Sequence, residues 1–220
     1  MSGGIAIVRR LGGCLVVDKP SGLLSVPGRG ESNQDCVIAR VREAIPEATG
    51  PMCVHRLDMD TSGLMVVALD AETHRDLSRQ FERRTVGKRY EALVDGRVDG
   101  ESGEIRLFQR VDIDDRPRQI LDDVHGREAI TRWQTLGVEV YGGLAVTRVE
   151  FTPVTGRSHQ LRVASATSRE SGGLECPILG DDLYGDGKRS AERLMLHARW
   201  LAFDDPSSGE RVEVESGVAF

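Results

Sequence analysis

Two polar clusters, about a hundred residues apart, carry the residue types that could do chemistry. Residues 55–63 read HRLDMDTSG and place Asp58 just before the apolar run at 64–69. Residues 156–162 read GRSHQLR and end on Arg162. A carboxylate on a loop that feeds a buried strand can act as a nucleophile or a base, and a guanidinium within ~4–6 Å would keep it ionised. Asp58 is therefore the candidate catalytic group, and Arg162 is its candidate partner.

Spacing alone leaves structural alternatives open for each of these residues. Asp58 could cap backbone N–H groups of a turn, and Arg162 could be a solvated residue of a helix that follows the turn at 155–156. Tyr90 could be a core residue of a strand. His55 and His159 could be structural hydrogen-bond donors. The clusters by themselves do not decide between these roles and catalysis.

The sequence gives no support for a metal or nucleotide site. Residues 58–63 begin like a calcium-binding loop, but Leu69 stands at the twelfth position, where such a loop needs glutamate. The cysteines and histidines lack the spacing of zinc ligands. A phosphate-binding glycine loop and a nucleophile elbow are also missing from the sequence. We expect chemistry by side chains, with no metal and no cofactor.

Composition indicates one cytoplasmic domain over residues 1–220. The chain is 39% hydrophobic, which supports a sizeable core. Its four cysteines form no C-x-x-C pair, as in proteins of a reducing compartment. Its apolar runs are shorter than the ~20 residues of a membrane span. The net charge is -6, yet nearly all basic residues are arginines, and several of them gather at 75–89, so we expect a basic face on an acidic body.

The hydrophobic pattern predicts many strands and few helices. Helices are expected at 37–44 and at 71–84, the second with Asp70 as its N-cap. Strands are expected at 14–18, 64–69, 90–94, 105–111, 129–136, 144–151, 196–203 and 211–215. This arrangement favours an α+β fold with a mixed, mainly antiparallel central sheet flanked by helices and loops.

The residues also resemble a known family. The string 55–63, the segment Lys88-Arg89-Tyr90 and the string 156–162 resemble, in order and spacing, the RluA-type family of RNA pseudouridine synthases. Residues 18–23 and the segments 177–181 and 184–185 are similar to the family too. The likeness covers about residues 15–202 and resembles most the short branch without an S4 RNA-binding domain. Ala164, where the family often has histidine, and the length of the 165–175 loop are departures that bear on the target.

The resemblance implies an isomerase that cleaves the C1'–N1 bond of a uridine and rejoins the base through C5. The implied partner is structured RNA, a stem-loop of ribosomal and/or transfer RNA, and the implied protein is a monomer without a cofactor. Asp58, Tyr90 and Arg162 would be catalytic. The implied substrate-binding residues are Arg56, Leu161, His55 and Arg157. Arg56 would enter the space that the target vacates or contact its phosphate, and Tyr90 would stack on the uracil.

Two alternatives belong to other functional classes. A non-catalytic RNA-binding or RNA-folding factor could use the same scaffold, although Asp58, Tyr90 and Arg162 speak against it. A carboxylate-based glycosidase would need a second acid with a raised pKa, and the sequence identifies none. Release of uracil would favour the glycosidase.

Overall fold

The computed structural model describes residues 4–187, 191–218 and 220. The chain divides into two compact units: unit 1 is Met1–Lys88 with Ala198–Ala219, and unit 2 is Arg89–His197 with Phe220. The chain passes from one unit to the other within strands β4 (Gly87–Asp95) and β9 (Leu196–Asp204). No Pro- or Gly-rich linker marks that boundary, so it leaves no signal in the sequence. The expectation of a single domain over 1–220 stays a prediction.

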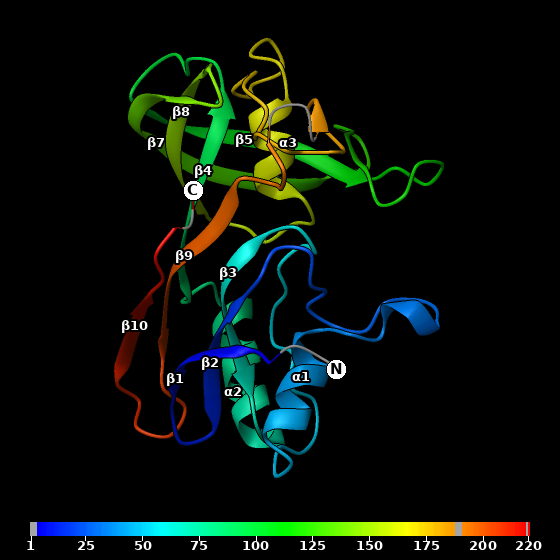
Figure 1. The fold of residues 1–220 in the computed structure, drawn as a ribbon, viewed down its shortest axis with the longest axis vertical. Coiled ribbons are helices and arrows are strands. Elements are labelled where there is room, and N and C mark those ends of the chain that lie inside the picture. The colour runs from blue at the N-terminus through cyan, green and yellow to red at the C-terminus, as the bar shows by residue number, and fades with distance from the viewer. Residues whose placement is uncertain (1–3, 188–190, 219) are drawn as a thin grey trace. The chain divides into compact units, whose positions relative to one another are not determined.

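Unit 1 contains strands packed against helices (Figure 1). Its strands β1 (Ala6–Arg10), β2 (Cys14–Lys19) and β3 (Ser62–Ala68) lie in the order β1-β2-β3-β9, and β10 (Arg211–Glu215) pairs with β9. The pairs β1/β2, β2/β3 and β9/β10 are antiparallel. Its helices are the short 3-10 helix η1 (Glu31–Asn33), α1 (Val37–Ala44) and α2 (Ala71–Glu82).

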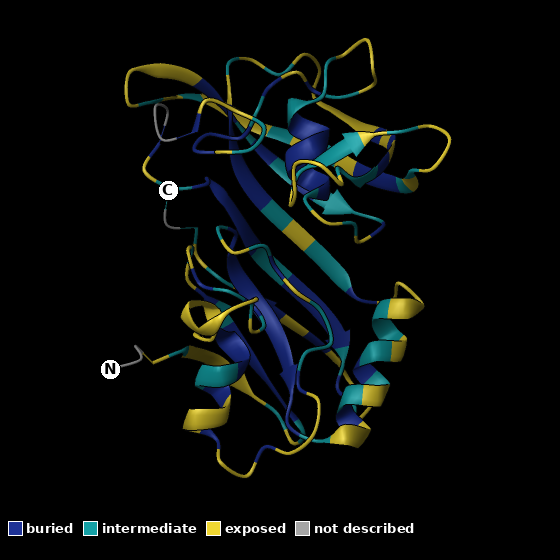
Figure 2. Ribbon diagram, turned by 90° about the vertical axis from the view of Figure 1, so that its right-hand side faces the viewer, coloured by how far each residue is buried: buried dark blue, intermediate teal, exposed yellow. Residues whose placement is uncertain are grey.

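Strand β3 is buried along its whole length, and Figure 2 shows the inner strands of unit 1 in dark blue. Side chains on one face, among them Leu64 and Val66, pack with Leu77 of α2. On the other face, the Ser25 hydroxyl contacts Met65 Sδ at 3.5 Å. Burial on both faces explains why this segment reads as a continuous apolar run.

Unit 2 is built on strands β4, β5 (Ser102–Val111), β6 (Gln119–Leu121), β7 (Arg127–Tyr141) and β8 (Leu144–Pro153), in the order β4-β8-β7-β5-β6. Each of these neighbouring pairs is antiparallel. Helix α3 (Gln160–Ala166) contributes Leu161, Val163 and Ala164 to a core that also contains Leu107 and Phe151. The α+β fold with a mainly antiparallel sheet is confirmed.

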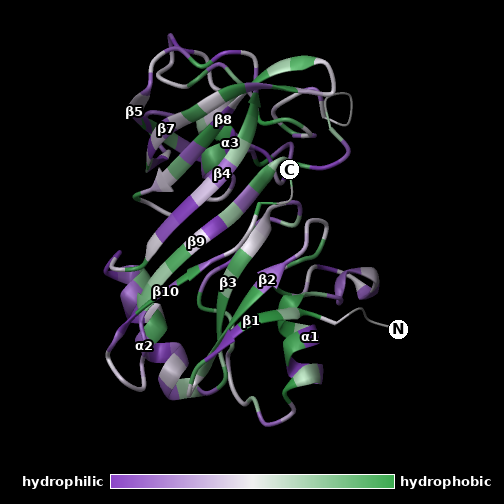
Figure 3. Ribbon diagram, turned by 60° about the vertical axis from the view of Figure 1, so that its left-hand side comes forward, coloured by the Kyte–Doolittle hydropathy of each residue, from purple (hydrophilic) through white to green (hydrophobic). Residues whose placement is uncertain are grey.

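Most predicted elements form where the pattern places them. Helix α1 and strand β10 have the predicted bounds, and Asp70 caps α2 by accepting from Thr73 N at 2.8 Å. Helix α2 ends at Glu82, two residues before the predicted Arg84, whose φ of 60° does not continue a helix. Figure 3 shows hydrophilic residues along α2, in contrast with the mostly hydrophobic β3. Among the described residues, none of the helices is long and apolar enough to span a membrane.

Two strands were missed, and several are longer than predicted, β7 most of all. Strand β1 is exposed at every residue, so no alternation of polar and apolar residues reveals it. Strand β6 has only three residues. Strand β7 continues five residues beyond Leu136, with Val138 and Val140 exposed. In each case the pairing of backbone groups, rather than burial of side chains, determines the strand.

Candidate active site

Asp58 lies half-buried in unit 1, on the loop that leads into β3. Its carbonyl accepts from Thr61 N at 3.2 Å, which closes a tight turn before the strand begins. Gly63 follows with φ of 115°, and a Cβ there would lie 2.4 Å from the Ala198 carbonyl oxygen. Only glycine fits both constraints, so the Ser62-Gly63 pair sets the path of the loop into the strand.

The buried ammonium group of Lys19 binds this loop. Lys19 ends β2 and has no exposed surface. Its Nζ donates to the carbonyls of Pro20, Leu23 and Met59 at 2.9, 2.6 and 2.6 Å. These bonds join the turn after β2 to the residue that follows Asp58.

Burial lowers the pKa of Lys19 to about 8, and the nearby carboxylates of Asp60 and Asp58 act in the opposite direction. The same turn makes two further bonds to the loop. Ser21 Oγ donates to the Asp60 carbonyl at 2.7 Å, and Gly22 N donates to the Met59 carbonyl at 3.0 Å. The carbonyls of Met59 and Asp60 are therefore held by several donors from one short segment.

Ser25 fixes the residue before Asp58. Its hydroxyl donates to the Leu57 carbonyl at 2.7 Å and accepts from Leu57 N at 3.1 Å. Leu57 is buried, whereas Arg56 on its other side is exposed. The exposed position of Arg56 is compatible with the predicted contact to RNA.

The His55 ring connects β3 to α2. Its Nε2 accepts from Val66 N at 3.1 Å, and the ring stacks on Phe81 with 4.5 Å between centroids and 20° between planes. Burial, with a smaller contribution from the positive charge of Lys88, lowers the pKa of His55 to about 3. The ring is therefore neutral at physiological pH and carries its proton on Nδ1. This geometry suits a structural role for His55, which holds the loop at 55–63.

The remaining predicted site residues lie in unit 2. Tyr90 is half-buried on β4, opposite Phe151 of β8. Leu161 and Arg162 are buried in α3. The Arg162 guanidinium binds Asp181 through two hydrogen bonds, Nε to Oδ2 at 2.8 Å and Nη2 to Oδ1 at 2.6 Å. The structure thus pairs Arg162 with Asp181 inside unit 2, and the predicted pairing of Arg162 with Asp58 stays a prediction.

The turn before α3 is held by Gln160, a buried residue that the sequence analysis did not single out. Its Oε1 accepts from Thr155 Oγ1 and Arg157 N, and its Nε2 donates to the Ile130 carbonyl. Arg157 Nε donates to the Glu128 carbonyl at 2.9 Å. Arg157 is therefore anchored to β7 at one nitrogen.

Comparisons with known proteins place these residues in a family. Residues 13–167 match the family model described as RNA pseudouridylate synthase. The chain is 43% identical over 197 residues to the dual-specificity RNA pseudouridine synthase RluA of Haemophilus influenzae, covering 89% of this chain and 84% of the relative. This chain belongs to the RNA pseudouridylate synthase family.

Other relatives and structures agree. The RluA enzyme of Escherichia coli K12 is 40% identical over 208 residues, covering 94% of this chain and 90% of that enzyme. The solved structure of human RNA pseudouridylate synthase domain containing 1 has a TM-score of 0.78 and 29% identity, covering 97% of this chain and 83% of that chain. The family resemblance read from the sequence is confirmed, and the protein is an isomerase that forms pseudouridine in RNA.

The sequence motifs account for only part of the candidate site. They identify Asp58, Tyr90 and Arg162 but not Lys19 or Ser25, which hold the 57–60 backbone through main-chain oxygens and nitrogens. Lys19 stands in the segment 18–23 that resembles the family, so its position was visible, but its burial was not. In the described part of the chain, no group of three or more His, Cys, Asp or Glu residues could hold a metal ion.

Replacing Lys19 should loosen the Asp58 loop. Lys19→Met leaves three carbonyls without their donor, at a cost of about 1–3 kcal/mol for each buried group left unsatisfied. We expect a lower free energy of unfolding in urea and faster hydrogen exchange at residues 57–62. Ser21→Ala, which removes one bond to the same loop, should cost about 1 kcal/mol. An unchanged exchange rate at 57–62 in Lys19→Met would contradict this role.

His55 should make stability depend on pH. Its folded-state pKa of about 3 lies below the ordinary value of 6.5, so the unfolded chain binds a proton that the folded chain does not, and stability falls as pH drops through about 6.5. Between pH 7 and 5.5 the unfolding free energy should fall by about 1 kcal/mol from this group. His55→Gln should lose that decline, whereas the exposed control His125→Gln should keep it. An equal decline in His55→Gln would refute the assignment.

Proposed function

We propose that this isomerase acts on specific uridines in stem-loops of ribosomal and/or transfer RNA, with Asp58 as its essential residue. The observation that carries the proposal is the way the 57–60 backbone is held next to a half-buried carboxylate. The substrate class is supported by relatives named as dual-specificity RNA pseudouridine synthases, 40–43% identical over most of the chain. The proposal keeps the expectations of a monomer and a cytoplasmic location.

The proposed reaction breaks the C1'–N1 bond and forms a C1'–C5 bond, while N1 gains a proton and C5 loses one. The rearrangement is redox-neutral, so it calls for no electron donor. Asp58 would act as the nucleophile toward the sugar or the base, or as the base that removes a sugar proton. A carboxylate whose loop is fixed before the substrate arrives avoids reorganisation during the reaction.

The other site residues take roles that fit their positions. Tyr90 would stack on the target uracil and assist loss of the C5 proton, and Leu161 would form an apolar wall. The target nucleotide must leave its stack at a cost of a few kcal/mol. Exposed Arg56 would occupy the vacated space or bind its phosphate. His55 would act by holding this loop, and Arg157 would bind substrate with the nitrogens outside its bond to Glu128.

An arginine stripe on α2 is the proposed phosphate contact of unit 1. Arg75, Arg79 and Arg83 are exposed and four residues apart, so they lie on one face, and Arg84 follows. None of the four forms an ion pair with another described residue. Contacts of this kind position RNA without reading its sequence. In unit 2, Arg116 and Arg118 are proposed to do the same.

Asp58→Asn tests the essential carboxylate. With RNA carrying tritium at C5 of uridine, tritium release measures turnover, and a filter-binding assay measures affinity. We expect turnover to fall by ~10³-fold or more, with RNA affinity kept within about threefold, because the amide preserves the shape of the side chain. Substantial turnover by Asp58→Asn would contradict the role of the carboxylate. So would a variant that loses RNA affinity but converts the RNA it binds at the wild-type rate in a single-turnover reaction.

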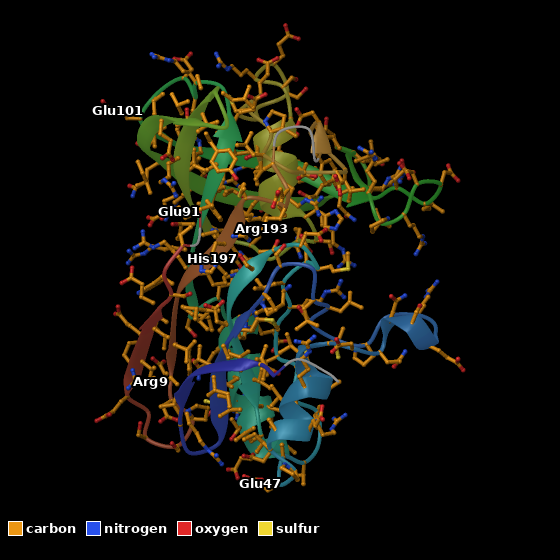
Figure 4. The ribbon with its side chains drawn as sticks, viewed as in Figure 1. Arg9, Glu47, Glu91, Glu101, Arg193 and His197 are labelled. Carbon is orange, nitrogen blue, oxygen red and sulfur yellow. The ribbon has the colours of Figure 1, made fainter. Side chains whose placement is uncertain are left out.

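The α2 stripe should contribute to the salt dependence of RNA binding. Arg83→Ala with Arg84→Ala removes two proposed phosphate contacts, so the slope of log K against log salt should become shallower by about 1–2. A matched control replaces the adjacent exposed pair Arg9 and Arg10 of β1, of which Arg9 is labelled in Figure 4. An unchanged slope in the Arg83/Arg84 variant, or an equal change in the control, would remove the stripe from the RNA-binding surface.

A further inference from the structure

The segments 177–181 and 184–185 are part of the family resemblance, but the resemblance implies no role for them. The structure places them beside α3 in unit 2, where Asp181 binds the buried Arg162. Gly180 precedes Asp181 with φ of 71°, and a Cβ there would collide with the Arg193 carbonyl oxygen. This glycine therefore lets the backbone turn so that the next side chain enters the interior.

Asp181 is a fully engaged carboxylate. Besides the two bonds from Arg162, its Oδ1 accepts from Leu183 N at 2.9 Å and Tyr184 N at 3.0 Å. Its side chain has no exposed surface, and that of Arg162 is 4% exposed. A bidentate pair fixes both the position and the plane of a guanidinium. Because Asp181 takes two of the five guanidinium N–H groups, three donors lie outside the pair.

The guanidinium of Arg162 lies over the ring of Tyr184. The Arg162 Cζ atom lies 5.3 Å from the centroid of the Tyr184 ring, and Arg118 lies 5.5 Å from that centroid. Both distances suit a cation–π contact. The Arg162 guanidinium is therefore held by two hydrogen bonds to Asp181 and by a cation–π contact with the Tyr184 ring.

The Tyr184 hydroxyl keeps the ring in place. It accepts from Gln119 N, at the start of β6, at 2.7 Å, and it lies 2.9 Å from His159 Nδ1. Burial raises the pKa of Tyr184 to about 12, so the hydroxyl retains its proton and can donate it to His159 Nδ1. The ring is thus tied to both α3 and the end of the loop that carries Arg118.

We propose that Asp181 and Tyr184 are positioning residues of the reaction, which hold the Arg162 guanidinium in its working orientation through the bidentate pair and the cation–π contact. This inference rests on the proposed role of Arg162 in pseudouridine formation. Neither residue is assigned contact with RNA. Tyr184 also connects Arg162 to the loop bearing Arg116 and Arg118, the proposed phosphate contacts of unit 2.

Tyr184→Phe tests the proposal because it removes only the hydroxyl group of Tyr184. The hydroxyl bonds to Gln119 and His159 disappear while the ring remains, so kcat should fall by about 3- to 10-fold and KM for RNA should stay within about twofold. Tyr141→Phe removes an equivalent hydroxyl from a half-buried tyrosine of β7 and should leave both constants unchanged. His159→Asn, which keeps an acceptor near the Nδ1 position and tolerates the residue's φ of 54°, should retain kcat.

Asp181→Asn is the stronger variant, with an expected fall in kcat of on the order of 10- to 100-fold. Reactions run well below the melting temperature of each variant separate positioning from unfolding, and if Asp181→Asn does not fold, Tyr184→Phe decides the question. A folded Tyr184→Phe with wild-type kcat, or a loss confined to KM, would overturn the proposal. Absence of pseudouridine with the wild-type protein would instead refute the proposed function, so the two failures are distinguishable.

Discussion

A lysine ammonium group with no contact to water is the constraint on which the candidate site depends most. Burying a cation is costly unless oxygen atoms replace its hydration, and Lys19 obtains them from the carbonyls of Pro20, Leu23 and Met59. Those oxygens can converge only if the turn after β2 and the Asp58 loop take one arrangement. Burial of the Lys19 ammonium group therefore fixes the backbone of the Asp58 loop. The hydrogen bonds of helices and strands do not fix this segment, because it belongs to neither.

Unit 2 uses the same physical principle with a different cation. Arg162 is buried in α3, and its charge is balanced by Asp181, whose remaining acceptor capacity binds two backbone N–H groups of the following turn. In unit 1 the buried charge of Lys19 fixes irregular backbone beside Asp58. In unit 2 the buried charge of Arg162, itself proposed for catalysis, binds Asp181 and the turn that follows it. Such preorganisation is what electrostatic catalysis requires, because the groups do not need to move when charge develops.

The elements that bury a clear face could be predicted from sequence, and those held by backbone bonds alone could not. The apolar periods of α1 and the run of β3 led to the correct elements, whereas β1 and β6 bury too little to leave a pattern. For the candidate site, the motifs predict Asp58, Tyr90 and Arg162, and these assignments stay predictions. The partner of Arg162 inside unit 2 was missed because Asp181 lies nineteen residues away and is brought in by the turn at Gly180. Ser25 and Gln160 hydrogen-bond to main-chain atoms of residues distant in the sequence, and such bonds have no sequence signature.

The most direct test of the account is chemical mapping of pseudouridine in total RNA from cells with and without this gene, complemented by the wild-type chain or by Asp58→Asn. If Asp58 is essential for pseudouridine formation, we expect at least one uridine in ribosomal or transfer RNA whose modification disappears without the gene and returns only with the wild-type chain. Modification restored equally by Asp58→Asn, or no site that depends on the gene, would contradict it.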